Sequence, residues 1–358
     1  MTDAPFPQRP VDLTGLGWDD AWADLAAASP ADVPGRVVRV DRGLAAVLTA
    51  GGLVRAGLSG GVLEAVATDR VAGPATGDWV LVRFWADDRV TLERVLARRT
   101  SVVRAGAGKS AEAQVLVSNA DLAAVVVGAI PDPGLAKVER LLALAWASGA
   151  RPLLLVAKAD LVTDAPALVA ELAADAPGVE TFAVSVVTGE GMARLRDVVG
   201  TSGTLALLGS SGVGKSSLVN ALVGAEVLRT RQIRDDGRGR HTSVRRELVP
   251  LPDGGCVVDT PGLRGVGLAG IDAGVTSVFP DLEQLAEACH FADCAHDGEP
   301  GCAVAAALDS GVLAARRLDA WLRLQREQAW MARRRDARLR ALESRSNKAR
   351  TWRNRHVE

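Results

Sequence analysis

Apolar and polar positions follow a short period in the first third of this chain. Between residues 35 and 103, strand-like runs read G-R-V-V-R-V, A-A-V-L-T-A, L-V-R-A-G-L, D-W-V-L-V-R-F and R-V-T-L-E-R-V-L. The turn signals D-R-G, G-G, S-G-G and A-D-D separate them. About five short strands at this spacing predict a small β-barrel, most simply an OB-fold, and an SH3-like barrel is the alternative.

The pattern changes after residue 104, where strand-like and helix-like segments alternate up to residue 275. Apolar strands are predicted at 121–128, 152–158, 182–186, 204–209 and 256–260. Helices are predicted over Ala136–Ser148, over Ala165–Asp175 and from Lys215 onward. This alternation indicates a doubly wound parallel sheet, with its sites at the carboxyl ends of the strands.

Both ends of the chain differ from these two parts. The pattern of residues 1–34 predicts a tail and one short helix. The pattern of residues 276–358 predicts helices around a cysteine-rich loop. The short helix has a polar side with Asp19, Asp20 and Asp24, and an apolar side with Trp18, Trp22 and Leu25. The sequence therefore predicts a multidomain α/β protein divided at residues 1–34, 35–103, 104–275 and 276–358.

Composition narrows the class of protein. The chain has 358 residues, enough for two or three domains, and 48% of them are hydrophobic while 24% are charged, which is typical of a globular protein rather than a disordered one. No apolar run approaches the ~18–20 residues that span a bilayer. The acidic N-terminus is no secretion signal. We therefore expect a cytoplasmic protein without a membrane partner.

The net charge of −1 hides an asymmetry between the ends of the chain. The first 34 residues carry six Asp and one Arg, whereas residues 333–355 carry ten Lys or Arg. The Arg-rich segment suits the phosphates of rRNA, and Trp352 within it suits stacking on a base. A solvated helix face or a tail is the alternative interpretation.

A glycine-rich segment follows the predicted strand at 204–209 and opens a helix. The sequence G-S-S-G-V-G-K-S-S is that of a phosphate loop, whose glycines let backbone amides approach phosphates closely. Lys215 brings a charge to the β and γ oxygens, and the Ser216 hydroxyl is a Mg²⁺ ligand. The predicted nucleotide-binding residues here are Gly209, Ser210, Ser211, Gly212, Val213, Gly214, Lys215, Ser216 and Ser217.

A second motif, D-T-P-G, follows the strand at 256–260. The Asp259 carboxylate at the strand end can hold Mg²⁺ through water, and the amide of Gly262 can sense the γ-phosphate. D-x-x-G alone is a frequent pattern. Its place after the phosphate loop makes it a strong signal.

A third motif indicates guanine. In V-A-K-A-D-L, which contains Ala157, Lys158, Ala159 and Asp160, the carboxylate of Asp160 can accept from both donors on the guanine edge. Adenine presents an acceptor there. The stem of Lys158 can lie over the base. The backbone of S-V-V-T-G, which begins at Ser185, can touch the guanine carbonyl. A strand-end charge pair is the alternative for Lys158 and Asp160.

The order of these motifs is unusual. The guanine motif precedes the phosphate loop, whereas an ordinary GTPase domain begins with the phosphate loop. The order therefore predicts a circularly permuted GTPase domain.

Three of the four cysteines lie within C-H-F-A-D-C-A-H-D-G-E-P-G-C. Cys289, Cys294 and Cys302 together with one histidine form a closed set of tetrahedral ligands, which is typical of structural zinc. Both His290 and His296 are candidates for the fourth ligand. Cys256 falls in an apolar strand and is expected in the core.

Taken together, these residues resemble the RsgA family, also called YjeQ or YloQ, over about residues 35–315. The resemblance rests on a β-barrel followed by A-K-x-D, S-x-x-T-G, G-x-S-G-V-G-K-S, G-R-H-T, D-T-P-G and C-x₄-C-x-H-x₅-C. It implies an OB domain, a permuted GTPase domain and a zinc domain. It also selects His296 as the fourth zinc ligand.

The resemblance implies a GTPase of small-subunit assembly, with GTP as substrate and Mg²⁺ and one Zn²⁺ as cofactors. It implies slow intrinsic hydrolysis that is stimulated by the 30S subunit during late maturation. The 30S subunit and 16S rRNA are the expected partners of a monomeric chain, with no role for DNA. The alternatives are a permuted GTPase of the large subunit and a nucleotide-binding rRNA adaptor with negligible hydrolysis.

Further roles are expected for residues in or beside the motifs G-R-H-T, D-T-P-G and A-K-x-D. His241 is expected to orient the attacking water, because Leu263 stands where Ras-like GTPases carry a glutamine. Thr242 is the candidate Mg²⁺ and γ-phosphate ligand, with Ser243 as the alternative. Ala157 replaces the usual asparagine of the guanine motif, which predicts weaker guanine binding.

Overall fold

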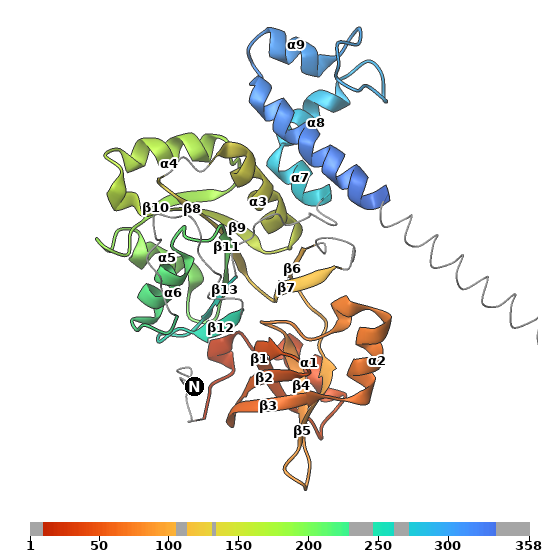
Figure 1. Cartoon of the computed structure of the whole chain (residues 1–358), viewed down its shortest axis with the longest axis vertical. Coiled ribbons are helices and arrows are strands. Elements are labelled where there is room, and N and C mark those ends of the chain that lie inside the picture. The colour runs from red at the N-terminus through yellow and green to blue at the C-terminus, as the bar shows by residue number, and fades with distance from the viewer. Residues whose placement is uncertain (1–9, 105–112, 131–133, 229–245, 261–271, 334–358) are drawn as a thin grey trace, which may run out of the picture.

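The computed structural model of the chain describes residues 10–104, 113–130, 134–228, 246–260 and 272–333 (Figure 1). A barrel, a six-stranded sheet between helices and a C-terminal group of helices follow one another along the chain. Among the described residues, no helix is both long enough and apolar enough to cross a membrane.

The N-terminal barrel is closed and has the strand order β1-β2-β3-β5-β4. Its strands are β1 (Val33–Asp41), β2 (Leu44–Thr49), β3 (Gly52–Leu58), β4 (Trp79–Phe84) and β5 (Val90–Val95). β1 pairs with both β2 and β4, and this pairing closes the barrel. The expected five strands and the OB-type barrel are confirmed.

One helix of the barrel was not expected. α2 (Gly60–Thr68) begins where the sequence S-G-G suggested a turn. The Ser59 hydroxyl accepts from the Val62 amide at 3.4 Å and caps the helix. Val62 is buried in the barrel core, so packing stabilises a helix that its glycines disfavour.

The short N-terminal helix lies against the barrel. α1 (Asp20–Ala27) begins after Asp19, whose carboxylate accepts from the Trp22 amide. Trp22 is buried, and Trp18 meets Trp79 edge to face with a centroid distance of 4.8 Å. The expectation that Leu25 belongs to the apolar side was wrong, because Leu25 is 43% exposed.

The second part is a sheet with the order β10-β9-β8-β11-β13-β12. Its strands are β8 (Leu122–Gly128), β9 (Arg151–Ala157), β10 (Glu180–Val184), β11 (Thr204–Gly209), β12 (Glu247–Pro250) and β13 (Cys256–Asp259). The first five in this order are parallel, but β12 pairs antiparallel with β13. The expected parallel sheet is confirmed for the five predicted strands, and β12 is an additional edge strand that was not expected. A separate ribbon of β6 (Ser101–Arg104) and β7 (Gln114–Ser118) was not expected either.

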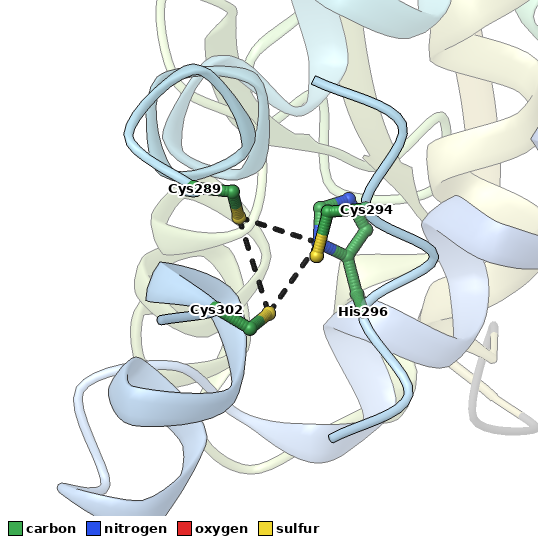
Figure 2. Close-up of side chains that lie close together, drawn as sticks. All are labelled: Cys289, Cys294, His296 and Cys302. Carbon is green, nitrogen blue, oxygen red and sulfur yellow. Dashed lines mark hydrogen bonds between the residues drawn. The ribbon is translucent and has the colours of Figure 1, made fainter. Parts of the chain in front are cut away.

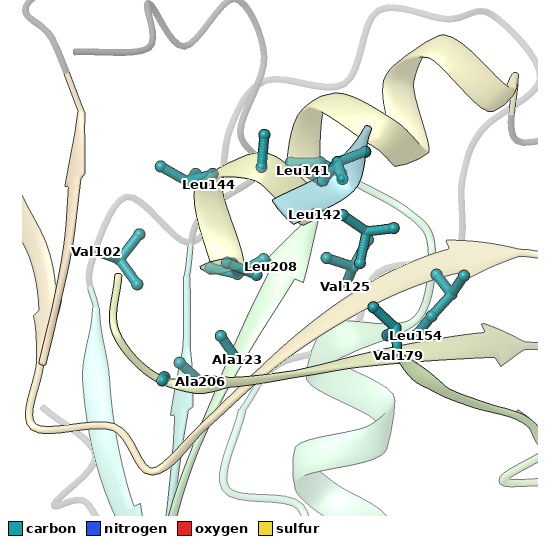
Figure 3. Packing of buried hydrophobic residues seen from close by; sticks show 14 of the residues in the cluster. Val102, Ala123, Val125, Leu141, Leu142, Leu144, Leu154, Val179, Ala206 and Leu208 are labelled. Atoms are coloured by element: carbon teal, nitrogen blue, oxygen red, sulfur yellow. The ribbon is translucent and has the colours of Figure 1, made fainter. Parts of the chain in front are cut away.

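Helices cover both faces of the sheet. They are α3 (Leu135–Ala147), α4 (Ala165–Ala174), α5 (Met192–Val199) and α6 (Lys215–Val223). Alternate residues of the strands enter two separate cores: Val125 packs with Leu142 of α3, as Figure 3 shows, whereas Val126 packs with Leu218 of α6. This is the arrangement of a doubly wound fold.

Partly buried ionic contacts attach the C-terminal helices to α3. These helices are α7 (Asp272–Val278), α8 (Pro280–Glu287), α9 (Ala303–Asp309) and a helix over 315–333. Arg140 of α3 donates twice to Glu327 at 2.7 Å, and Arg317 donates to the buried Glu139 at 3.3 Å. Burial raises the pKa of Glu139, while Arg317 and Arg316 act against that shift.

Candidate functional site

The strands β9, β10, β11 and β13 all end at one edge of the sheet, and each is followed by a residue of a sequence motif. Because these strands are parallel, their carboxyl ends meet there. Motifs that are far apart in the sequence thus come together at a single edge.

The phosphate loop connects β11 to α6, as the motif requires. A Cβ atom at Gly209 would lie 2.5 Å from the Val126 carbonyl oxygen, so only glycine fits. Lys215 is 6% exposed, and its Nζ donates to the carbonyl oxygens of Gly209 and Ser210 at 3.0 and 2.9 Å. Burial lowers the pKa of Lys215, and the Asp259 charge opposes this. The amine is thus held inside the loop. The other expected residues, Ser211, Gly212, Val213, Gly214, Ser216 and Ser217, occupy the loop and the first turn of α6.

The guanine motif lies directly beside the phosphate loop. Lys158 has a left-handed φ of 60° at the end of β9, and its Nζ donates to the Gly212 carbonyl oxygen at 2.9 Å. A Cβ atom at Gly214 would lie 3.9 Å from Ala157 Cβ. Sequence reasoning placed Lys158 over the base but did not foresee its bond to the loop.

Asp160 is held by Ser185 from the neighbouring strand. Ser185 Oγ donates to Asp160 Oδ1 at 2.5 Å, and accepts from the amides of Val187 and Thr188 at 3.2 Å. Asp160 itself is exposed, in a short 3₁₀ turn that contains Ala159. Sequence reasoning gave Ser185 a backbone role and missed its hydroxyl. The signal was available, because a serine directly follows the strand beside β9.

Ser216 and Asp259 meet on the other side of the phosphate loop. Ser216 Oγ donates to Asp259 Oδ2 at 2.7 Å, while the buried Asp259 Oδ1 has no hydrogen-bond partner among the residues that the structure describes. Burial raises the pKa of Asp259, and Ser216 and Lys215 act against that rise. A hydroxyl and a buried carboxylate with an unpaired oxygen are hard oxygen donors, which fit Mg²⁺.

The four expected zinc ligands lie close together in the C-terminal part (Figure 2). Their ligand atoms all lie within 4.8 Å of one another, and they belong to Cys289, Cys294, His296 and Cys302. His296 Nδ1 is 3.6 Å from the sulfurs of both Cys289 and Cys302, and these sulfurs are 3.9 Å apart. A zinc tetrahedron with ~2.3 Å Zn–S bonds has S–S edges of about 3.8 Å, so the cluster fits Zn²⁺.

The competing histidine lies outside this cluster. His290 is exposed, and its ring contacts Phe291 edge to face. Cys256 lies apart from the cluster as well, fully buried in β13, and burial raises its pKa to about 11.

Comparisons with known proteins agree with this arrangement. The family model described as RsgA GTPase matches residues 95–269. The chain is 47% identical to the small ribosomal subunit biogenesis GTPase RsgA of Streptomyces coelicolor, over 95% of this chain and 93% of that one. It is 40% identical to the protein of the same name from Opitutus terrae, over 90% and 92% of the two chains. The chain belongs to the RsgA family.

As an RsgA protein, the chain is a GTP hydrolase. Solved structures support the fold. YjeQ from Thermotoga maritima matches with a TM-score of 0.59 and 23% identity, over 82% of this chain and 97% of that one. YloQ, described as a circularly permuted GTPase, matches with a TM-score of 0.54 and 21% identity, over 86% and 96%. The permuted order inferred from the motifs is therefore confirmed.

Several expected residues of this RsgA protein lie outside the described residues. They are His241, Thr242, Ser243, Gly262, Leu263 and Trp352. Their assigned roles remain predictions.

Proposed function

We propose that this RsgA protein binds the 30S ribosomal subunit and assists its late maturation. It hydrolyses GTP to GDP and phosphate, and the subunit stimulates this turnover. The observation that supports the proposal most directly is the contact of Lys158 with Gly212, beside the Asp160–Ser185 pair, because it joins a guanine motif to a phosphate loop. The names of the Streptomyces coelicolor and Opitutus terrae relatives supply the subunit.

In the proposed mechanism, Asp160 accepts from guanine while Lys215 and the loop amides bind the phosphates. Ser216, Asp259 and Thr242 would hold Mg²⁺, which neutralises charge on the β and γ phosphates when bound. His241 orients a water molecule toward the γ-phosphorus. The new P–O bond forms as the bond to the GDP oxygen breaks, and the water protons remain on the released phosphate.

The other proposed binding residues complete the pocket. Ala157, Ala159, Ser185 and Gly262 line the nucleotide together with the phosphate loop. Cys289, Cys294, His296 and Cys302 hold one structural Zn²⁺. On this proposal the chain acts as a cytoplasmic monomer on 16S rRNA, and its domains divide at residues 1–34, 35–103, 104–275 and 276–358.

GTP turnover with 30S particles, with 50S particles and with no particle tests this proposal. We expect slow turnover alone and clear stimulation by 30S only. Stimulation by 50S only would indicate a large-subunit factor. No stimulation by either particle would indicate an rRNA adaptor, and both results contradict the proposal.

A further inference from the structure

One carboxylate holds the backbone on both sides of the histidine in the cysteine-rich loop. This loop, residues 288–302, joins α8 to α9 through turns and bends. Glu299 Oε1 accepts from the Ala295 amide at 2.8 Å, and Glu299 Oε2 accepts from the Asp297 amide at 2.7 Å. Both distances are those of charge-assisted hydrogen bonds. Because the two amides flank His296, a single side chain ties the backbone before and after this residue.

His296 has a backbone conformation that is uncommon for residues other than glycine. Its φ is 62°, in the left-handed region. A left-handed residue turns the neighbouring amides toward the same side, and the resulting concavity binds anions. Here the anion is the carboxylate of Glu299, which lies three residues further along the chain. The carboxylate therefore stabilises a turn that the histidine alone disfavours.

The same turn sets the direction of the His296 ring. Figure 2 shows the ring directed at the cysteine sulfurs, with Nδ1 3.6 Å from Sγ of both Cys289 and Cys302. The ring also packs against Trp321 at a centroid distance of 5.4 Å, and Trp321 is 2% exposed. Nδ1 is the ring nitrogen nearer to the backbone, so its position depends closely on the backbone conformation of His296.

Glu299 also contacts the last ligand residue, through its main chain. Its carbonyl oxygen accepts from the Cys302 amide at 3.1 Å. Glu299 thus connects the segment that carries Cys294 and His296 to the segment that carries Cys302. A residue outside the ligand set links both parts of the site.

We propose that Glu299 is a positioning residue for zinc, whose carboxylate holds the left-handed turn at His296 and so directs Nδ1 into the site. Three thiolates and one imidazole already complete a tetrahedral set, so Glu299 acts through the backbone rather than as a ligand. Residues that orient a metal ligand in this way commonly account for about 10- to 100-fold in metal affinity. The inference rests on the proposed zinc site and names what orients its histidine.

The charge of Glu299 has the opposite effect on zinc binding. Three thiolates and Zn²⁺ together carry a net negative charge, and a nearby carboxylate disfavours it. If charge were the only influence, neutralising Glu299 would strengthen zinc binding. The positioning role predicts weaker binding, so the sign of the change separates the two effects.

The main test measures zinc affinity by competition with a chromophoric chelator. Glu299→Ala removes both side-chain hydrogen bonds and should bind zinc about 10- to 100-fold more weakly than the wild type. Glu299→Gln keeps one acceptor oxygen, so it should show a smaller loss in the same direction. Asp293→Asn is the matched control, because it neutralises an exposed carboxylate next to Cys294 and outside the turn. It should bind zinc no more weakly than the wild type.

A spectroscopic measurement distinguishes the aim of the imidazole from the general stability of the loop. The visible absorption of Co²⁺ in place of zinc depends on the ligands and their geometry. Glu299→Ala should change this spectrum, because water competes with a poorly directed His296, whereas Asp293→Asn should keep the wild-type spectrum. Hydrogen exchange on the zinc-loaded proteins should show faster exchange of the Ala295 and Asp297 amides in Glu299→Ala only.

Three outcomes would overturn the inference. If Glu299→Ala binds zinc as tightly as Asp293→Asn and keeps the Co²⁺ spectrum, the carboxylate does not position His296. If Glu299→Gln binds zinc more tightly than the wild type, Glu299 acts through its charge alone. If the wild type itself binds no zinc, the proposed zinc site fails, and the role of Glu299 fails with it.

Discussion

Lys158 Nζ donates to the Gly212 carbonyl oxygen at 2.9 Å across 54 residues of sequence. This bond joins the guanine motif to the phosphate loop. In this chain Ala157 stands where the family usually has an asparagine, so position 157 offers no side-chain hydrogen bond. Lys158 therefore supplies a side-chain hydrogen bond between the two motifs, which an alanine at position 157 cannot form.

Lys158→Ala should weaken GTP binding by about tenfold, because a hydrogen bond from a charged group contributes about 1.5–3 kcal/mol. Titration with a fluorescent GTP analogue measures this. Arg151→Ala is the matched control, since Arg151 is exposed at the opposite end of β9. Equal affinities in the two variants would contradict the bracing role of Lys158.

Asp160→Asn should reduce the preference for GTP over ATP in competition titrations, because the amide replaces an acceptor by a donor. We expect GTP binding to weaken about 10- to 100-fold, because a hydrogen bond to a charged group contributes about 1.5–3 kcal/mol. Ser185→Ala removes the donor that orients Asp160 and should have a smaller effect in the same direction. A preference unchanged in Asp160→Asn would show that guanine is recognised elsewhere.

Asp259→Asn should make the nucleotide-free protein more stable while weakening the dependence of GTP binding on Mg²⁺. Burial raises the pKa of Asp259 above its usual 3.8, so the folded state binds its proton more tightly than the unfolded state does. The stability of the nucleotide-free protein therefore falls as pH rises from about 4 through the raised pKa. Asparagine does not ionise, so the variant does not lose stability in this way. Its melting temperature should therefore exceed that of the wild type at pH 7.5.

The same variant should bind GTP with a weaker dependence on Mg²⁺, because it loses a carboxylate ligand. Thermal melts at pH 5 and 7.5 and GTP titrations with and without Mg²⁺ measure both effects. A variant that is less stable than the wild type at pH 7.5, or one with full Mg²⁺ dependence, would contradict this assignment.

Cys302→Ser should remove most of the bound zinc, which metal analysis should find at about one ion per wild-type chain. It should also increase hydrogen exchange over residues 280–310, because Cys302 Sγ accepts from the Ala305 amide at the start of α9. Cys256→Ser is the control, since Cys256 is buried in β13 outside the cluster. The assignment fails if the control loses zinc as well, or if Cys302→Ser retains it.

His241→Ala should leave GTP affinity nearly unchanged and lower 30S-stimulated turnover by about tenfold or more, which is within the range for one catalytic group. Single-turnover kinetics with and without 30S particles measure this. Unchanged stimulated turnover would exclude His241 from orienting the water.

The sequence was most informative where chemistry constrains residue types. Gly209 must be glycine because the Val126 carbonyl lies so close, and the sulfur atoms of Cys289 and Cys294 converge as their spacing suggested. The order of the motifs was sufficient to infer the permuted domain. In these places a local sequence pattern corresponds directly to a local structure.

The rest depended on tertiary packing, which single-sequence patterns describe poorly. α2 forms because Val62 packs into the barrel, although glycines open the helix. The direction of β12 depends on its pairing with β13, and no residue in Glu247–Pro250 encodes that direction. Leu25 has the spacing of a buried residue but is exposed, because Trp22 already fills the contact with the barrel.

Helix α3 also has a mechanical consequence. It starts at Leu135, just beyond the carboxyl end of β8, the strand that lies between the guanine motif and the phosphate loop. Glu139 and Arg140 lie one turn further along α3. They form ion pairs with Arg317 and Glu327 of the helix over 315–333. At a rise of ~1.5 Å per residue, about 8 Å of helix separates the start of α3 at Leu135 from the ion pair of Arg140. A tilt of α3 at its first turn would therefore be transmitted to the C-terminal helices without any flexible joint between them.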